Sequence, residues 1–211
     1  MPKIGMAPIR RRQVMDAVIR LIERGGWEAL TLKGVGAEAG VSTGIVAHYF
    51  GAKDAMVADA IRDAYRRFSD DALAAVDARA RPLEKLIALV DRVVTESVPS
   101  WAFWIAMWGK MPFDATIRHE LTMVYRQYTM LVAGILRAAV ADGSITKDIN
   151  PDRCADLFVA LIDGLGMRSE LGQGEMEPER QRSLLFQFWS EQLDMPDIGA
   201  SEDSLVRMPT A

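Results

Sequence analysis

Cysteine is nearly absent from this sequence: the chain of 211 residues holds one, Cys154. A single thiol excludes an internal disulfide framework and a metal site built from four cysteines, and it suits a reducing compartment. Histidine is almost as scarce, with only His48 and His119. The chain therefore offers little material for metal binding or histidine-based catalysis, and we predict no metal, no cofactor and no enzymatic activity.

Long apolar runs are also missing. The most apolar segment, Trp101 to Trp108, is far too short to span a bilayer. Near the start of the chain, Pro8-Ile9 runs directly into Arg10-Arg11-Arg12, so a signal peptide is not expected. We therefore predict a cytoplasmic protein with no membrane partner.

The net charge of −4 first argues against nucleic acid as a partner, but its distribution argues the opposite. Residues 1–53 hold eight basic and four acidic side chains, a net charge of +4, and the remainder of the chain carries −8. A basic head on an acidic body is expected where only one end of a protein touches phosphate. Chance fluctuation over a short window is the alternative.

Apolar residues recur at helical spacing almost throughout, and no segment shows the alternation of a strand. We predict an all-α fold of about nine helices, in which a three-helix head precedes a helical-bundle body. Residues 8–53 form the predicted DNA-binding domain, which a long helix to about residue 79 joins to the body. Residues 54–195 form the predicted body, and residues 196–211 a disordered tail.

The segment Thr31–Lys53 has the spacing of a helix-turn-helix. Thr31 and Ser42 can each cap a short helix, and Gly40 between them can take the left-handed conformation of a tight turn. Val41 would fill the angle between the two helices, and Gly36 would lie where they cross closely. The remaining apolar positions form a predicted small core: Val35, Ala39, Val46 and Phe50.

The outer face of the second short helix is left to contact the major groove or its phosphates. Its predicted DNA-binding residues are Ser42, Thr43, Gly44, His48 and Tyr49. Basic residues outside that helix complete the predicted set: Arg10, Arg11, Lys33 and Lys53.

These residues carry a resemblance to a known family. The run Val41 to Phe50, followed by Lys53, resembles the recognition-helix signature of the TetR family of transcriptional repressors. Arg10–Arg12, Gly25-Gly26-Trp27 and Leu30-Thr31-Leu32 fit the same family's three-helix head. Many members have a tyrosine that touches the DNA backbone where Ala47 stands, so His48 and Tyr49 are expected to contribute more here.

Two further segments resemble a narrower group within that family, the repressors of choline-to-glycine-betaine genes. They are the opening run from Met1 to Arg11 and the run Leu161-Ile162-Asp163-Gly164-Leu165. The resemblance implies a dimer that binds a palindromic operator and is released by a small-molecule inducer, for which the choline or betaine type is the candidate.

Three other motifs have simpler interpretations. Gly34 to Ala39 matches the dinucleotide-binding pattern G-x-G-x-x-A, but no strand–helix–strand unit surrounds it. His119-Glu120 is interpreted as a solvated pair on a long helix. Cys154, on an apolar helix face, is interpreted as buried packing rather than as a nucleophile.

Two apolar helix faces predict a dimer interface. One consists of Leu157, Phe158, Leu161, Ile162 and Leu165, and the other of Leu184, Leu185, Phe188, Trp189 and Gln192. By resemblance, the last two helices form a four-helix bundle with their copies in a second subunit. Burial of both faces inside one subunit is the alternative.

An aromatic stripe predicts a ligand site. Trp101, Trp104 and Trp108 share one helix face, with Tyr125 and Tyr128 as further aromatic residues and Asp163 or Glu96 as an anion. Aromatic faces attract a quaternary ammonium through the ring quadrupole. Core packing is the alternative for such a stripe.

The sequence therefore predicts a ligand-responsive homodimeric repressor that binds double-stranded operator DNA. Residues 8–53 form its predicted helix-turn-helix DNA-binding domain, and residues 54–195 its predicted ligand-binding and dimerisation domain. The alternatives are a ligand-binding or structural dimer whose head does not read DNA, and a regulator of the same fold with an unrelated apolar inducer.

Overall fold

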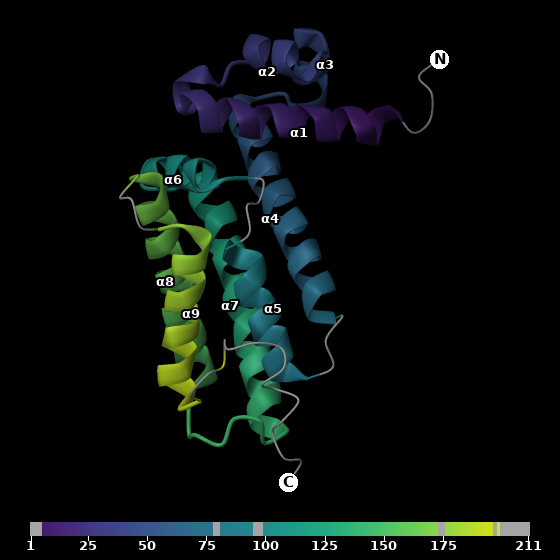
Figure 1. Ribbon diagram of the computed structural model, residues 1–211. Helices are drawn as coiled ribbons and strands as arrows, with labels where there is room; N and C mark the ends of the chain where they lie inside the picture. The colour runs from purple at the N-terminus through teal and green to yellow at the C-terminus, as the bar shows by residue number, and fades with distance from the viewer. Residues whose placement is uncertain (1–5, 78–80, 95–98, 173–175, 196–197, 199–211) are drawn as a thin grey trace. The chain divides into compact units, whose positions relative to one another are not determined.

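The computed structural model describes residues 6–77, 81–94, 99–172, 176–195 and 198. Within these ranges the chain forms nine α-helices, one short 3-10 helix and no strand, which confirms the all-α prediction (Figure 1). The helices are α1 (Met6–Gly25), η1 (Trp27–Ala29), α2 (Leu32–Ala39), α3 (Thr43–Phe50), α4 (Lys53–Asp77), α5 (Pro82–Val94), α6 (Trp101–Lys110), α7 (Ala115–Ala141), α8 (Pro151–Glu170) and α9 (Pro178–Leu193).

Local signals in the sequence fix where these helices begin. Prolines open α5, α8 and α9, because a proline in the first turn loses no helical hydrogen bond. Asn150 caps α8, since its side chain accepts from the backbone N–H of Arg153 at 3.0 Å. The predicted tail lies outside the described residues except for Ile198, which is buried.

The chain divides into two compact units. Unit 1 comprises Met1–Phe68 and Ser97–Tyr125, and unit 2 comprises Ser69–Glu96 and Arg126–Ala211. Two of the three boundaries fall inside long helices, so α4 and α7 contribute to each unit.

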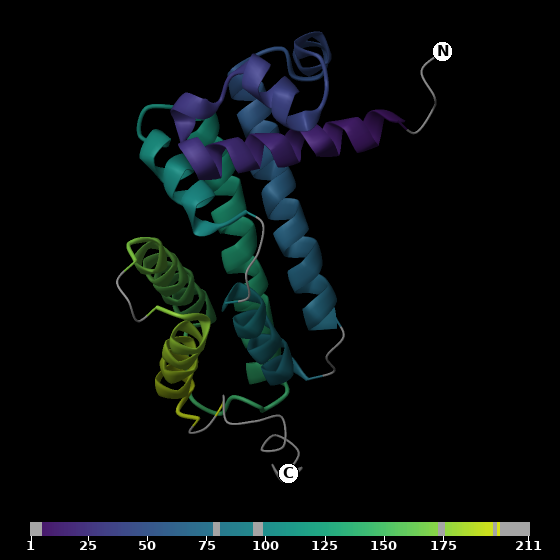
Figure 2. The same ribbon diagram turned by 45° about the horizontal axis from the view of Figure 1, so that its top comes forward.

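In unit 1, α1 packs against α2 and α6, and α2 packs against α3. Figure 2 shows α6 alongside the C-terminal half of α1. One apolar cluster joins these helices to the adjoining parts of α4 and α7, and it includes Val18, Val46, Ile61, Phe103 and Leu121. The helices that carry the helix-turn-helix therefore share their core with α6.

In unit 2, α9 packs against α5 and α8. Phe158 and Trp189 are fully buried there, with ring centroids 4.7 Å apart, and Phe188 stacks on Phe158 at 6.1 Å. Arg182 of α9 also binds Asp91 of α5 at 2.6 Å. The apolar pattern predicts that Phe158 and Trp189 lie on faces shared between subunits, but both are buried by their own chain. Only part of the predicted α8 face remains available to a partner.

Candidate nucleic-acid interface

The helix-turn-helix forms as the sequence predicts. The Thr31 side chain accepts a hydrogen bond from the backbone N–H of Gly34 at 2.9 Å, and Ser42 accepts one from Ile45 at 3.3 Å. Gly40 takes a left-handed conformation with φ of +66°. The two caps and the glycine set the angle between α2 and α3.

Close backbone contact fixes the turn further. A Cβ atom added at Gly36 would lie 2.9 Å from the carbonyl oxygen of Val41 and 3.3 Å from the backbone nitrogen of Thr43. Both are backbone atoms, which cannot move aside as the end of a side chain could. Gly36 therefore lies at the predicted crossing point, and the half-buried Val41 packs on the core beside it.

The outer face of α3 is open to solvent. Its exposed residues begin at the cap and continue along the helix: Ser42, Thr43, Gly44, Ala47, His48 and Tyr49. The rings of His48 and Tyr49 meet edge to face at 5.5 Å, while Val46 and Phe50 point into the core. The structure thus confirms the exposure on which the predicted DNA contacts depend.

The predicted basic contacts differ in their surroundings. Lys33 is exposed on α2, whereas Arg11 of α1 forms an ion pair with Asp59 of α4 at 2.5 Å. Lys53 donates to the carbonyl oxygen of Trp27 at 3.2 Å, and its ammonium lies 5.0 Å from the centre of the Trp27 ring. The side chain of Arg10 lies outside the described residues. Arg11 and Lys53 are therefore both held by partners within the chain.

Sequence reasoning missed the link between α1 and α2 that Glu38 makes. Its carboxylate accepts from Arg20 Nε at 2.8 Å and also binds Arg24, and hydrogen bonds from these two arginines lower the pKa of Glu38. One acidic side chain thereby joins α2 to two successive turns of α1. No spacing rule identifies this pair of contacts, because the partners lie 18 and 14 residues away.

The tryptophan helix α6 belongs to unit 1. Trp104 and Trp108 are half-buried and pack on the unit 1 core, as Tyr125 does, whereas Trp101 is half-buried with its ring 6.4 Å from that of Trp108. Tyr128, which is buried, and Asp163, which is half-buried, belong to unit 2. Glu96 lies outside the described residues. Within unit 1, the structure therefore brings Trp101 and Trp108 together and places Trp104 and Trp108 at the core surface.

Glu23 links α6 to the head. Its carboxylate accepts a 2.6 Å hydrogen bond from the backbone N–H of Ser100, the residue that precedes α6. Free N–H groups at a helix start favour a negative charge, so this contact stabilises the start of α6 against α1.

The structure shows the surroundings of the three remaining sequence motifs. Gly34 to Ala39 lies within α2, so the nucleotide-binding context is missing, and Cys154 is buried, which raises the pKa of its thiol. His119 is exposed, but Glu120 is buried and binds Arg62 of α4, so the interpretation of His119-Glu120 as a solvated pair is wrong for Glu120.

Among the described residues, no group of three or more histidine, cysteine or acidic side chains could hold a metal ion. No helix in the described part of the chain is long and apolar enough to cross a membrane.

Comparisons with known proteins identify the family. Residues 14–60 match the family model for bacterial regulatory proteins of the tetR family, and residues 82–194 match the model for the BetI-type transcriptional repressor C-terminal domain. The chain belongs to the TetR family. Its head is thus a DNA-binding domain of a transcriptional regulator, and its body is of the BetI type, as the resemblance indicated.

Curated TetR-family relatives extend along most of the chain. The HTH-type transcriptional regulator BetI of Rhizobium meliloti (strain 1021) is 32% identical over 191 residues, which cover 87% of this chain and 89% of the relative. The BetI regulator of Agrobacterium fabrum (strain C58 / ATCC 33970) is also 32% identical, over 97% of this chain and 98% of its own length.

Solved structures share the fold. A putative transcriptional regulator from Saccharomonospora viridis in complex with choline matches with a TM-score of 0.80 and 24% identity, over 88% of this chain and 98% of that one. A putative regulator from Pseudomonas aeruginosa PAO1 matches with a TM-score of 0.76 and 24% identity, over 90% and 92%.

Proposed function

We propose that this TetR-family regulator is a homodimeric repressor that reads a palindromic operator through α3 and is released by a small-molecule inducer. The observation that carries the proposal is the exposed face of α3, which presents Thr43, His48 and Tyr49 on a fully capped helix-turn-helix. One head makes few contacts, and a dimer doubles them on two half-sites one helical turn apart. The function needs no catalytic residue and no cofactor.

The proposed second subunit covers the outer face of α8. Leu157 and Met167 of α8 are exposed, as is Leu171 directly after the helix, and Gly164 between them has no neighbour within 4 Å of an added Cβ atom. Exposed apolar side chains gathered on one helix face are typical of a surface that a partner buries. The absence of a side chain at Gly164 would allow a second helix to approach closely.

The proposed inducer is a quaternary ammonium compound of the choline type. The half-buried rings of α6 support it, because a cation over an aromatic face is stabilised by the ring quadrupole. The BetI-type body and the choline-bound relative from Saccharomonospora viridis support the same ligand class. Trp101 is the proposed ligand contact on this helix, because Trp104 and Trp108 already pack on the unit 1 core.

Sequence-specific DNA binding is tested by selecting bound fragments from genomic DNA and measuring their affinity with random competitor present. We expect the selected fragments to be bound at least about a thousandfold more tightly than random DNA and to share an inverted repeat. Equal affinity for both would overturn the proposal and favour the alternative, a dimer whose head does not read DNA.

Inducer binding is tested by titrating choline, betaine aldehyde and glycine betaine while tryptophan fluorescence and operator release are followed. We expect one of them to change the emission saturably and to weaken operator binding by roughly 5- to 150-fold at a matching concentration. Trp101→Phe should weaken this response, since phenylalanine has the weaker quadrupole, whereas Trp104→Phe should chiefly lower thermal stability. Release by an uncharged apolar compound, with no effect of these three, would contradict the quaternary-ammonium proposal and leave the family assignment intact.

A further inference from the structure

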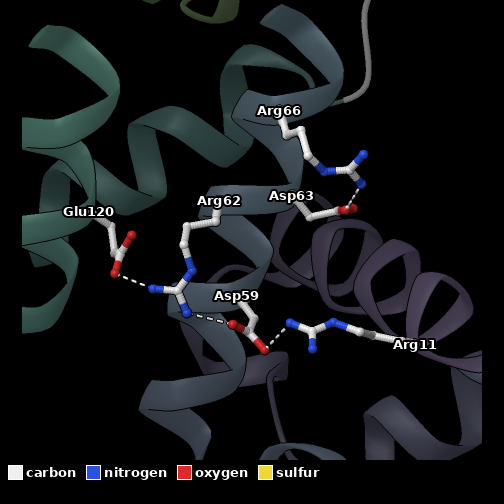
Figure 3. A network of polar contacts seen from close by, with 6 residues as sticks. All are labelled: Arg11, Asp59, Arg62, Asp63, Arg66 and Glu120. Carbon is white, nitrogen blue, oxygen red and sulfur yellow. Dashed lines mark hydrogen bonds and ion pairs between the residues drawn. The ribbon is translucent and has the colours of Figure 1, made fainter. Parts of the chain in front are cut away.

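Four charged side chains of unit 1 form a continuous chain of ion pairs across α1, α4 and α7 (Figure 3). Arg11 binds one oxygen of Asp59 at 2.5 Å, and Arg62 binds the other oxygen at 2.5 Å. The second terminal nitrogen of Arg62 binds Glu120 of α7. The two bridging residues, Asp59 and Arg62, therefore each hold two partners at once.

Burial is unequal along this chain. The side chains of Asp59 and Glu120 are only 18% and 10% exposed, whereas those of Arg11 and Arg62 are each 53% exposed. A buried carboxylate without its cation is costly, so Glu120 keeps Arg62 in place. Arg62 in turn orients Asp59, and Asp59 fixes the outward-lying guanidinium of Arg11.

Arg11 also reaches the recognition helix. Its guanidinium carbon lies 5.8 Å from the ring centre of Phe50, the last residue of α3, and the Phe50 ring is buried in the core. Arg11 thus stands where α1, α3 and α4 meet. A side chain held at that junction can set the position of the C-terminal end of α3.

We propose that Asp59 and Glu120 are positioning residues for DNA recognition. They hold Arg11 against the C-terminal end of α3, and Glu120 does so through Arg62. This inference rests on the proposed function, because it concerns the same recognition helix. The four side chains carry two positive and two negative charges. The cluster as a whole therefore adds no net charge to attract DNA, and its contribution is one of geometry.

Replacing the Asp59 carboxylate by an amide distinguishes a positioning role of this residue from a purely electrostatic one. Charge alone predicts that Asp59→Asn strengthens binding to every DNA, because a negative charge near phosphate is removed. A purely structural role predicts weaker binding to every DNA together with a lower melting temperature. Positioning predicts a third pattern, in which selected DNA is bound less tightly and random DNA is bound equally or more tightly.

The test compares Asp59→Asn and Glu120→Gln with Glu84→Gln, which removes the same charge from an i, i+3 pair with Arg81 within unit 2. Affinities for selected and random DNA are measured over a range of salt concentrations, together with thermal unfolding. We expect the ratio of selected to random affinity to fall about tenfold in Asp59→Asn, less in Glu120→Gln, and not in Glu84→Gln. The melting temperatures of Asp59→Asn and Glu84→Gln should stay close to the wild-type value.

A measurement without DNA tests the link itself. Nuclear magnetic resonance of the arginine guanidinium groups, with Arg11 assigned from Arg11→Lys, should show restricted rotation in the wild type and faster rotation in Asp59→Asn. If the wild-type protein binds selected and random DNA with equal affinity, the proposed function and this inference are both overturned. A wild type that reads its DNA while the affinity ratio of both variants stays unchanged would overturn the inference alone, as would an Arg11 guanidinium equally mobile in wild type and Asp59→Asn.

Discussion

Replacing Leu157 by glutamate should convert the protein to monomers and abolish operator binding at concentrations where the wild type binds fully. Leu157 is 44% exposed on α8, on the face that the proposed second subunit covers. A charge buried there without a partner costs several kcal/mol, which corresponds to a dissociation constant of the dimer raised roughly a hundredfold or more. Operator affinity should fall with it, because each half-site is then bound by a single head.

Met130→Glu is the matched control for this variant. Met130 is 65% exposed on α7, so the same charge is placed on an exposed apolar residue outside α8. Sedimentation should show monomers for Leu157→Glu and dimers for Met130→Glu, and circular dichroism should show the same helical content for both. Leu157→Glu that remains dimeric would place the interface elsewhere on the molecule.

Phe158→Glu is not a useful test of assembly. Phe158 is fully buried between α8 and α9 of its own chain, so a charge there would unfold unit 2 before it affected a second subunit. The helical period of α8 shows that both Leu157 and Phe158 lie on apolar stripes, but period alone does not reveal what covers each stripe. For this reason the sequence predicts a single apolar face on α8, whereas in the structure Phe158 is buried within its own chain and Leu157 is exposed.

Features determined by neighbouring residues could be predicted from the sequence. Gly40, Ser42 and Thr31 specify the turn and caps of the helix-turn-helix through their own backbone preferences and short side chains. Prolines at the first positions of α8 and α9 mark the helix starts in the same way. Local chemistry decides each of these features, so the element bounds follow closely.

Contacts between distant segments could not be predicted. Glu120 lies 58 residues from Arg62, and Arg11 lies 48 residues from Asp59. Any of the acidic residues could have paired with these arginines, and only the packed helices select the partners. The same holds for α6, whose tryptophan spacing fits both a ligand site and a core, and which the fold attaches to the head through Glu23.

The two histidines of the chain provide a matched test of whether α3 recognises DNA. His48 on α3 and His119 on α7 are both exposed, so His48→Ala and His119→Ala remove the same side chain with little expected effect on stability. Removing a base or phosphate interaction from one head makes the free energy of DNA binding less favourable by roughly 1–3 kcal/mol, and in a dimer both heads lose it.

We therefore expect His48→Ala to weaken binding to the selected operator by at least about tenfold, with dimerisation and melting temperature unchanged. Tyr49→Ala should act in the same direction, and His119→Ala should bind as the wild type does. Operator affinity measured by gel shift at one salt concentration decides the matter. Wild-type affinity in both His48→Ala and Tyr49→Ala would contradict the assignment of α3 as the recognition helix.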